Sequence, residues 1–306
     1  MKVAIIPTLN ELQLSTLGDF DLVEIPWCVD YYGYRRYYTR RSRDDKRYVI
    51  LDNGAGISAS PVSEDSIREV SRYIQPAEVV APDMRGKGAQ SFELTAKFLL
   101  PIATALLKGA DLTYKVMITP QGKDRKEWEV MYIKLIRLIR TLELSEYAVI
   151  GVPKWLTWDG DDQFNRVDIL SSMGKVATDI PHHLLGGGRF LLQEINAARH
   201  VECIRGIDTS APVALAAQDI PLLEDTELVR STTFNLRSHL PSVDLARRNI
   251  ELLMSVARGE TEEKKVVQKA SSGNVPSSKQ EDKPRTAAPH TPTKGRSEGT
   301  KEASKE

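Results

Sequence analysis

Short apolar runs alternate with longer amphipathic stretches along most of this 306-residue chain, and this alternation limits the possible folds more than any other feature. A short apolar run is typical of a buried strand, and apolar positions at helical spacing are typical of a covering helix. Repeated alternation of the two favours a parallel sheet covered by helices. The eight runs are Val3–Ile6, Leu22–Ile25, Val49–Leu51, Val79–Ala81, Tyr114–Ile118, Ala148–Ile150, His183–Leu185 and Cys203–Ile207.

Helices are predicted between several of these runs. Acidic residues directly after Ser63 suit the dipole at a helix start. Eight strands in roughly 210 residues predict a closed (β/α)8 barrel, or TIM barrel, over residues 1–258, since such barrels usually have about 250 residues. The other predicted helices are Phe92–Leu107, Trp128–Leu142, Arg189–Arg199 and the closing helix Ser242–Val256.

The C-terminal segment, residues 259–306, differs in composition. It has no aromatic residue, and Ser, Lys, Glu, Pro and Thr dominate it. Such a segment cannot bury enough apolar surface to offset the entropy cost of ordering, so a disordered polar tail is predicted. The alternative is a weak tether to nucleic acid or to a partner protein.

Composition excludes several classes of protein. The chain is 41% hydrophobic with a formal net charge of zero, which allows one large core or two small ones. No apolar run is long enough to span a bilayer, and the N-terminal run is too short for a signal peptide. Cys28 and Cys203 cannot form a disulfide framework or a multi-cysteine zinc site. We therefore expect a reduced, cytoplasmic protein, in the host cytoplasm if a phage encodes it, with no metal and no membrane partner.

Polar residues and glycines follow the predicted strands at corresponding positions. The active site of a (β/α)8 barrel forms at the C-terminal ends of the strands, so these residues would face one mouth. Two carboxylates in one pocket suit a reaction that needs a nucleophile and a proton carrier, because their shared field separates their pKa values. Glutamine and exposed backbone groups suit a planar heterocycle. The segments are Asp52–Gly54, Pro82–Asp83, Pro120–Gly122, Gly151–Pro153, Gly186–Gly188 and Asp208–Ser210.

The stretch Tyr48–Gly56 is the most informative of these. Its apolar strand ends at Asp52, and the glycines behind it allow a sharp turn and the close approach of a flat ligand. The alternative is an ordinary strand followed by a turn, with Asp52 capping the next element.

Five segments, in chain order, resemble motifs of one enzyme family. The family segments are Asp-Ser-Gly-Gly-Phe at Leu51–Gly56, Val-Gln-Gly at Thr119–Gly122, the Gly-Gly-Leu-Ala loop at Ile150–Pro153, Leu-Met-Gly at His183–Gly186 and Arg-Gly-Val-Asp at Arg205–Asp208. Between Val3 and Pro212 the chain therefore resembles the tRNA-guanine transglycosylase superfamily. It is most similar to the 7-deazaguanine DNA transglycosylases of phages and bacteria. The fold of that family, a (β/α)8 barrel, agrees with the strand count.

The resemblance implies a base exchange in DNA that needs no cofactor. An aspartate attacks the sugar C1′ and guanine leaves, and a 7-deazaguanine then displaces the aspartate from the same carbon. A second carboxylate moves the protons, and by position this general acid and base is Asp52. The residues that fall where the family holds the base are Asp83, Gln121, Gly151, Leu185 and Gly186.

The chain departs from the family at the nucleophile. The family's nucleophile lies at the second aspartate of a Val-Asp-Met-Phe-Asp pattern, where this chain has Ala211. Asp208 is the only nearby carboxylate and is therefore the candidate nucleophile. The departure also leaves open a catalytically inactive barrel that binds nucleic acid or supports an active partner.

A second departure concerns zinc. The family's tRNA enzymes carry a zinc site of three cysteines and a histidine, which two distant cysteines cannot supply. This favours DNA as the substrate, with tRNA as the alternative. The adjacent His182 and His183 are expected to pack or to form hydrogen bonds at their strand. The glycines 186–188 before a helix could hold a phosphate, but they lack the spacing of a dinucleotide-binding fingerprint.

Residues 31–43 interleave aromatic residues with arginines. Arginine pairs with phosphate in a forked geometry, and tyrosine offers a face for an unstacked base, so this cluster predicts contact with DNA. The alternative is a solvated basic loop whose tyrosines face the core. The residues predicted to bind nucleic acid are Arg35, Arg36, Tyr37, Arg40 and Arg41.

Overall fold

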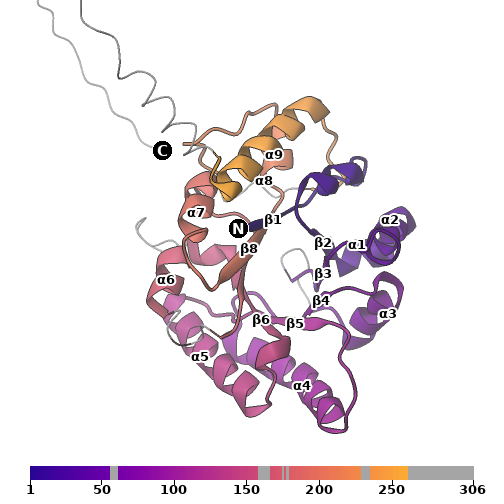
Figure 1. Cartoon of the computed structure of the whole chain (residues 1–306), viewed down its shortest axis with the longest axis vertical. Coiled ribbons are helices and arrows are strands. Elements are labelled where there is room, and N and C mark those ends of the chain that lie inside the picture. Colours follow the sequence, from indigo (N-terminus) through magenta and orange to yellow (C-terminus); the bar gives the residue numbers. More distant parts are fainter. Residues whose placement is uncertain (56–60, 158–165, 174–175, 177–178, 229–234, 261–306) are drawn as a thin grey trace, which may run out of the picture. The chain divides into compact units, whose positions relative to one another are not determined.

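The predicted TIM barrel is confirmed. The structure, a computed structural model, describes residues 1–55, 61–157, 166–173, 176, 179–228 and 235–260. Its eight strands form one parallel sheet in the order β1-β8-β7-β6-β5-β4-β3-β2, and an isolated bridge between Ala4 and Phe20 nearly closes the ring. Figure 1 shows the strands inside a ring of helices. The strands are β1 Lys2–Ile5, β2 Asp21–Glu24, β3 Val49–Asp52, β4 Glu78–Val80, β5 Lys115–Ile118, β6 Ala148–Pro153, β7 His182–Leu185 and β8 Ile204–Thr209.

Helices follow most of the strands and run back along the outside of the barrel. The predicted helices all form, with ends shifted by a few residues. The α-helices are α1 Ile25–Asp30, α2 Tyr32–Arg43, α3 Glu64–Ile74, α4 Gly88–Leu107, α5 Arg125–Thr141, α6 Arg166–Met173, α7 Leu191–Ala198, α8 Ala211–Ala216 and α9 Val243–Arg258. Short 3-10 helices cover Leu12–Leu17 (η1), Ser145–Tyr147 (η2) and Lys154–Thr157 (η3).

Local signals explain where these helices begin and end. The Ser63 side chain accepts a hydrogen bond from the Ser66 backbone N–H, which caps α3 as its acidic first turn predicts. Asp124 caps α5 in the same way, through the backbone N–H of Glu127. α9 ends at Gly259, whose φ of 81° lies in the left-handed region that glycine tolerates.

Alternation along each strand separates two apolar cores. Residues that point outward pack against the helices, as Val23 of β2 and Leu51 of β3 do. Residues that point inward fill the barrel as a separate cluster. Its buried members are Ala4, Phe20, Leu22, Ile50, Val80, Met117 and Val149, with Ile6 and Leu185 packed against them.

An ion pair crosses the N-terminal face of the barrel. Arg205 of β8 donates to both carboxylate oxygens of Glu78, each at 2.6 Å, although β4 is four strands away in the sheet order. The Tyr48 hydroxyl donates to the same carboxylate at 2.8 Å, and Glu78 is fully buried. These groups occupy the end of the barrel opposite the mouth, because all of them lie at or beside strand starts.

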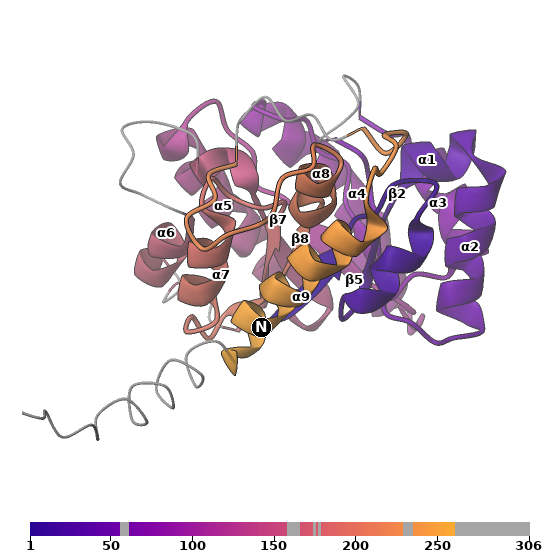
Figure 2. The same ribbon diagram turned by 90° about the horizontal axis from the view of Figure 1, so that it is seen from above.

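The termini of the barrel meet. The Met1 ammonium group donates to the carbonyl of Ala257, and Figure 2 shows the N-terminus beside the end of α9. The chain divides into two units, Met1–Lys264 and Lys265–Glu306, and every element named above belongs to the first. Apart from Gly259 and Glu260, the predicted disordered tail lies outside the described residues, as does Gly56.

Candidate active site

Three carboxylates face the interior at the C-terminal end of the barrel. Glu24 lies two residues after the inward-pointing Leu22, and Asp52 lies two residues after Ile50, so both point to the same side of the sheet as the interior cluster. Asp208 contacts His183, whose ring packs edge-on against Phe20 in that cluster. Asp52 and Asp208, predicted to share one mouth, therefore do so.

Burial and mutual repulsion favour the protonated forms of two of these carboxyl groups. Burial raises the pKa of Asp52 well above its usual value, and the charges of Glu24, Asp208 and Asp83 raise it further. Burial also raises the pKa of Glu24 to about 7, with a smaller contribution from Asp208. The carboxyl groups of Asp52 and Glu24 can therefore hold a proton at neutral pH and release it to a substrate.

Asp208 is held at both carboxylate oxygens. Its Oδ1 lies 3.0 Å from His183 Nε2, and its Oδ2 accepts a hydrogen bond of 3.1 Å from the backbone N–H of Gly186. The Asp208 residue is 4% exposed. It was predicted to follow a strand, but it lies within β8, because the strand continues to Thr209. Each oxygen keeps a further lone pair, so a fixed carboxylate remains able to attack.

A fully buried arginine supports the backbone behind Asp208. Arg166 of α6 donates to the carbonyls of Val152 and Leu185, at 2.7 and 2.8 Å, and also to the carbonyl of Gly186. The Arg166 Nε donates to the Glu194 carboxylate at 2.8 Å, and this ion pair neutralises the charge of the arginine. This ion pair therefore joins the ends of β6 and β7 and orients the Gly186 N–H towards Asp208.

Two of the five residues predicted to bind the base, Asp83 and Gln121, form a hydrogen-bonded network with Asn53 and Trp155. Asp83 accepts from the Asn53 side chain at 2.6 Å and from the Gln121 side chain at 2.5 Å. The Gln121 carbonyl accepts from the Trp155 indole at 3.1 Å. Burial raises the pKa of Asp83 to about 6, against the two amide donors, which lower it. The network presents donors and acceptors in fixed positions.

Gly151 lets neighbouring side chains pack closely in the barrel interior. A Cβ on Gly151 would lie 2.8 Å from both Leu185 Cδ1 and Thr119 Oγ1, so only glycine allows these two side chains to pack this closely against β6. Gly151 lies within β6 rather than beyond it. Among the atoms that the structure describes, the buried Thr119 hydroxyl has no hydrogen-bond partner. Leu185 thus offers an apolar surface, and Thr119 an unused polar group.

The predicted nucleic-acid cluster forms helix α2, with Tyr34 and Tyr38 buried against the barrel. Arg41 donates to the buried Asp21 at 3.2 Å and to Asp45 at 3.3 Å, so its charge serves the fold. Asp21 begins β2, which places this end of α2 away from the mouth. Arg35 lies over the Tyr73 ring, with its Cζ 5.0 Å from the centroid. Exposed side chains remain at Arg36 and Arg40, while Tyr37 is half-buried.

Both histidines form hydrogen bonds at β7, as predicted. His182 points outward, and its Nε2 lies 2.9 Å from the Tyr132 hydroxyl of α5. Burial lowers the pKa of His182 to about 4. Across the described ranges, no group of three or more histidine, cysteine, aspartate and glutamate residues could hold a metal ion. No helix in the described part of the chain is long and apolar enough to cross a membrane.

Glu24, His183, Arg166 and Glu194 were not predicted as site residues. Glu24 had a usable signal, since it is a charged residue inside the apolar run Leu22–Ile25 and points to the same side of the strand as Leu22. His183 reaches Asp208 across 25 residues, and Arg166 reaches Glu194 across 28. Contacts between residues so far apart in the sequence produce no local pattern from which they could be predicted.

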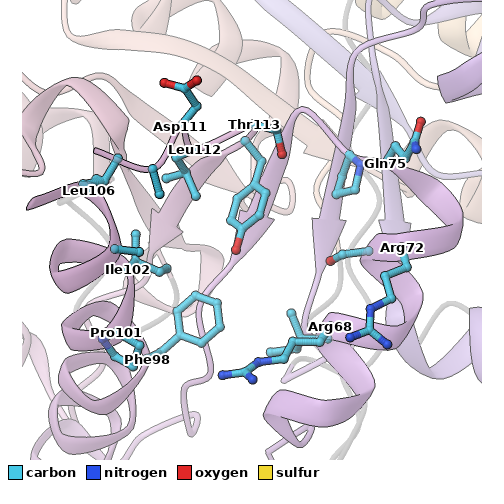
Figure 3. A pocket seen from close by; sticks show the side chains of 16 residues that line it. Arg68, Arg72, Gln75, Phe98, Pro101, Ile102, Leu106, Asp111, Leu112 and Thr113 are labelled. Carbon is cyan, nitrogen blue, oxygen red and sulfur yellow. The ribbon is translucent and has the colours of Figure 1, made fainter. Parts of the chain in front are cut away.

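A separate groove lies outside the barrel between α3 and α4. It has a volume of about 810 Å³ and is close to the starts of β4 and β5, so it is remote from the mouth. Figure 3 shows apolar side chains of α4 on one wall and arginines of α3 on the other. The labelled residues of these walls are Phe98, Ile102 and Leu106, and Arg68 and Arg72. It lacks the clustered carboxylates of the mouth.

No family model matches this chain, and no curated protein matches its sequence.

Proposed function

We propose that this protein exchanges guanine in DNA for a 7-deazaguanine through a covalent bond between Asp208 and the sugar. The observation that carries the proposal is the pairing of two kinds of carboxyl group in one mouth. Asp208 is fixed by two hydrogen bonds, while burial keeps a proton on the neighbouring Asp52 and Glu24. A nucleophile and a proton donor are the two groups that displacement at an anomeric carbon requires.

The proposed reaction proceeds through two successive displacements at C1′. An Asp208 oxygen attacks C1′, the bond from C1′ to guanine N9 breaks, and the departing base takes a proton from Asp52 or Glu24. The incoming 7-deazaguanine returns a proton to that carboxylate, its N9 attacks C1′, and Asp208 is released. Each proton given in the first step is recovered in the second, so no other reactant is consumed.

The Asp83–Gln121 network supports a purine-like base as the leaving group. Amide and carboxylate groups on one side match the donors and acceptors of a guanine edge. Leu185, which packs against the interior cluster and against Gly151, gives the base an apolar surface to lie against. The five sequence motifs favour this reaction, and the lack of a cysteine set favours DNA over tRNA. A base inside a duplex must be turned out before attack, so single-stranded DNA is the simplest substrate.

The direct test measures incorporation of radiolabelled guanine into single-stranded DNA, duplex DNA and tRNA. Asp208→Asn keeps the shape of the side chain but removes the attacking charge, so we expect it to abolish exchange. It should also abolish a denaturation-resistant protein–DNA adduct that forms when no incoming base is present. Asp52→Asn should slow exchange by about 10²–10⁴-fold, the usual contribution of general acid–base catalysis.

The matched control is Asp111→Asn, at an exposed carboxylate before the start of β5 and thus at the end of the barrel opposite the mouth, which should exchange as the wild type does. Full activity of Asp208→Asn would refute the nucleophile assignment. Exchange into tRNA alone would select the tRNA alternative. Binding of nucleic acid with no exchange into any of the three would select the inactive barrel.

A further inference from the structure

Lys154 crosses the mouth next to the candidate nucleophile. It follows the last residue of β6 and begins η3. Its aliphatic stem lies against Gly186, where an added Cβ would be 2.8 Å from Lys154 Cδ. Gly186 is the residue whose backbone N–H donates to Asp208. The lysine therefore extends over the backbone that holds the attacking carboxylate.

The Lys154 ammonium group is not neutralised by the fold. Among the described residues it forms no ion pair within 4 Å, although the Asp208 and Glu24 charges are near enough to raise its pKa. Burial is the largest influence and lowers the pKa of Lys154. Lys154 is an exposed residue, so an anionic ligand can reach its ammonium group.

A second cation approaches the same place from another strand. Arg85 lies in the loop after β4 and is exposed. The backbone N–H of the next residue, Gly86, donates to Gln121 Oε1 at 3.4 Å, and the same oxygen accepts from the indole of Trp155, the residue after Lys154. The Arg85 charge also lowers the pKa of Lys154. No carboxylate in the described ranges pairs with Arg85. Two cations that repel each other, each without a partner, are stabilised together by one anion between them.

We propose that Lys154 and Arg85 bind a phosphodiester group of the substrate beside the nucleotide whose base is exchanged. The inference rests on the proposed function for the identity of that nucleotide. Arginine can grip two phosphate oxygens at once, while lysine supplies a compact charge. With the phosphate above Gly186, the attached sugar lies over Asp208, so the site selects a nucleotide within a chain over a free nucleoside.

The test uses a single-stranded trinucleotide with guanine in the middle. A neutral methylphosphonate replaces either its 5′ or its 3′ phosphodiester, and fluorescence anisotropy gives the Kd. For the wild type, one of the two replacements should weaken binding by about tenfold or more, as expected for a charge-assisted contact. In Lys154→Gln and in Arg85→Gln the same replacement should change the Kd by less than about threefold, because the contact is already lost.

Lys126→Gln, at an exposed lysine of α5, is the matched control and should keep the full wild-type penalty. If the methylphosphonate replacement weakened binding to Lys154→Gln and to Arg85→Gln as much as it weakens binding to the wild type, the proposal would be overturned. So would the absence of a penalty at either phosphodiester in the wild type.

A second measurement does not depend on nucleic acid or on exchange. Pyridoxal 5′-phosphate is an aldehyde that carries a phosphate, and its imine with a lysine amine is fixed by borohydride. Condensation releases water, and the hydride reduces the imine to a secondary amine. Peptide mass spectrometry should find Lys154 labelled before other lysines, and Arg85→Gln should slow this labelling.

Pyridoxal without the phosphate should show a smaller preference for Lys154 and a smaller effect of Arg85→Gln, because the lowered pKa of Lys154 favours both aldehydes and the phosphate contact favours only one. Labelling of Lys154 at the same rate as exposed lysines, or no effect of Arg85→Gln, would refute the phosphate site. Preferential labelling of Lys154 in a protein that performs no guanine exchange would instead refute the proposed reaction and leave the phosphate site standing.

Discussion

At the scale of single residues, Glu24 shows how a buried carboxyl group in the proposed site can lower stability. Its carboxyl group is enclosed by the barrel mouth, which raises its pKa to about 7. A group with a folded-state pKa above its unfolded value stabilises the fold below the unfolded pKa. That contribution disappears as the pH rises through the folded pKa. At pH 8 the protein therefore bears the cost of a buried charge that catalysis would use.

Glu24→Gln should remove this cost. Relative to the wild type, the variant's free energy of unfolding should be higher at pH 8 than at pH 5, by about 2–3 kcal/mol for a shift from about 4.5 to about 7. Urea unfolding at the two pH values measures the difference. Glu93→Gln, at an exposed glutamate of α4, should give a constant difference at both. A Glu24→Gln effect independent of pH would show that the carboxyl group is not perturbed.

His182 contributes with the opposite sign. Burial lowers its pKa to about 4, so the unfolded chain takes up a proton near pH 6.5 that the folded protein cannot accept. The wild type should therefore lose about 2 kcal/mol at pH 5 through this group. In His182→Gln the loss of stability between pH 7 and pH 5 should be smaller by that amount, as measured by urea unfolding. An equal acid sensitivity in both proteins would contradict the assignment.

At the scale of elements, α2 has a buried face and an exposed face within one sequence pattern. Tyr34 and Tyr38, four residues apart, form its buried face, and Arg41 turns back to the buried Asp21. Arg36 and Arg40 remain exposed. Composition alone could not predict which arginines pair within the fold and which remain exposed, because this depends on which face of α2 packs against the barrel.

This separation gives distinct expectations for the arginines of α2. Arg36→Ala with Arg40→Ala should leave stability nearly unchanged, and if the cluster contacts DNA, it should lower the slope of log K against log salt by up to about two. Arg41→Ala should destabilise the fold by about 3 kcal/mol or more, because it leaves the Asp21 carboxylate with fewer partners in the interior. Salt titrations of DNA binding and thermal unfolding measure the two effects. An unchanged salt slope would return α2 to a structural role.

The elements were more predictable than the site. The strands and helices follow from apolar periodicity, which is a local property, and the eight apolar runs each became a strand. Asp52, Asp83, Gln121 and Asp208 could be placed at one mouth because parallel strands end on the same side. The Asp208–His183 and Arg166–Glu194 contacts could not be predicted, since each depends on how distant strands and helices register in space.

At the scale of the whole molecule, the described elements form the core of the first unit, Met1–Lys264. α9 closes it, with Leu245, Ile250 and Leu253 buried and Ser242 and Gly259 at its ends. The composition of residues 265–306 offers little apolar surface for packing. Stability should therefore reside in the first unit.

Truncation after Lys264 should leave the thermal unfolding temperature and base exchange nearly unchanged, because every described core contact is retained. Truncation after Asp244 should instead prevent stable folding, because it removes most of α9 from the core. Differential scanning calorimetry compares the two. A fall of several degrees after truncation at Lys264 would show that the removed residues contribute to the folded unit.

The near closure of the barrel has a consequence for synthesis on the ribosome. Among the strands that the structure describes, β1 pairs along its length only with β8, and Arg205 of β8 donates hydrogen bonds to Glu78. At about 5–20 residues per second, the first strand made waits on the order of 10–40 s for its partner. During that interval the apolar β1 and the anionic Glu78 have left the ribosome without the groups that later satisfy them. Nascent chains of this protein should therefore depend on chaperones until β8 emerges.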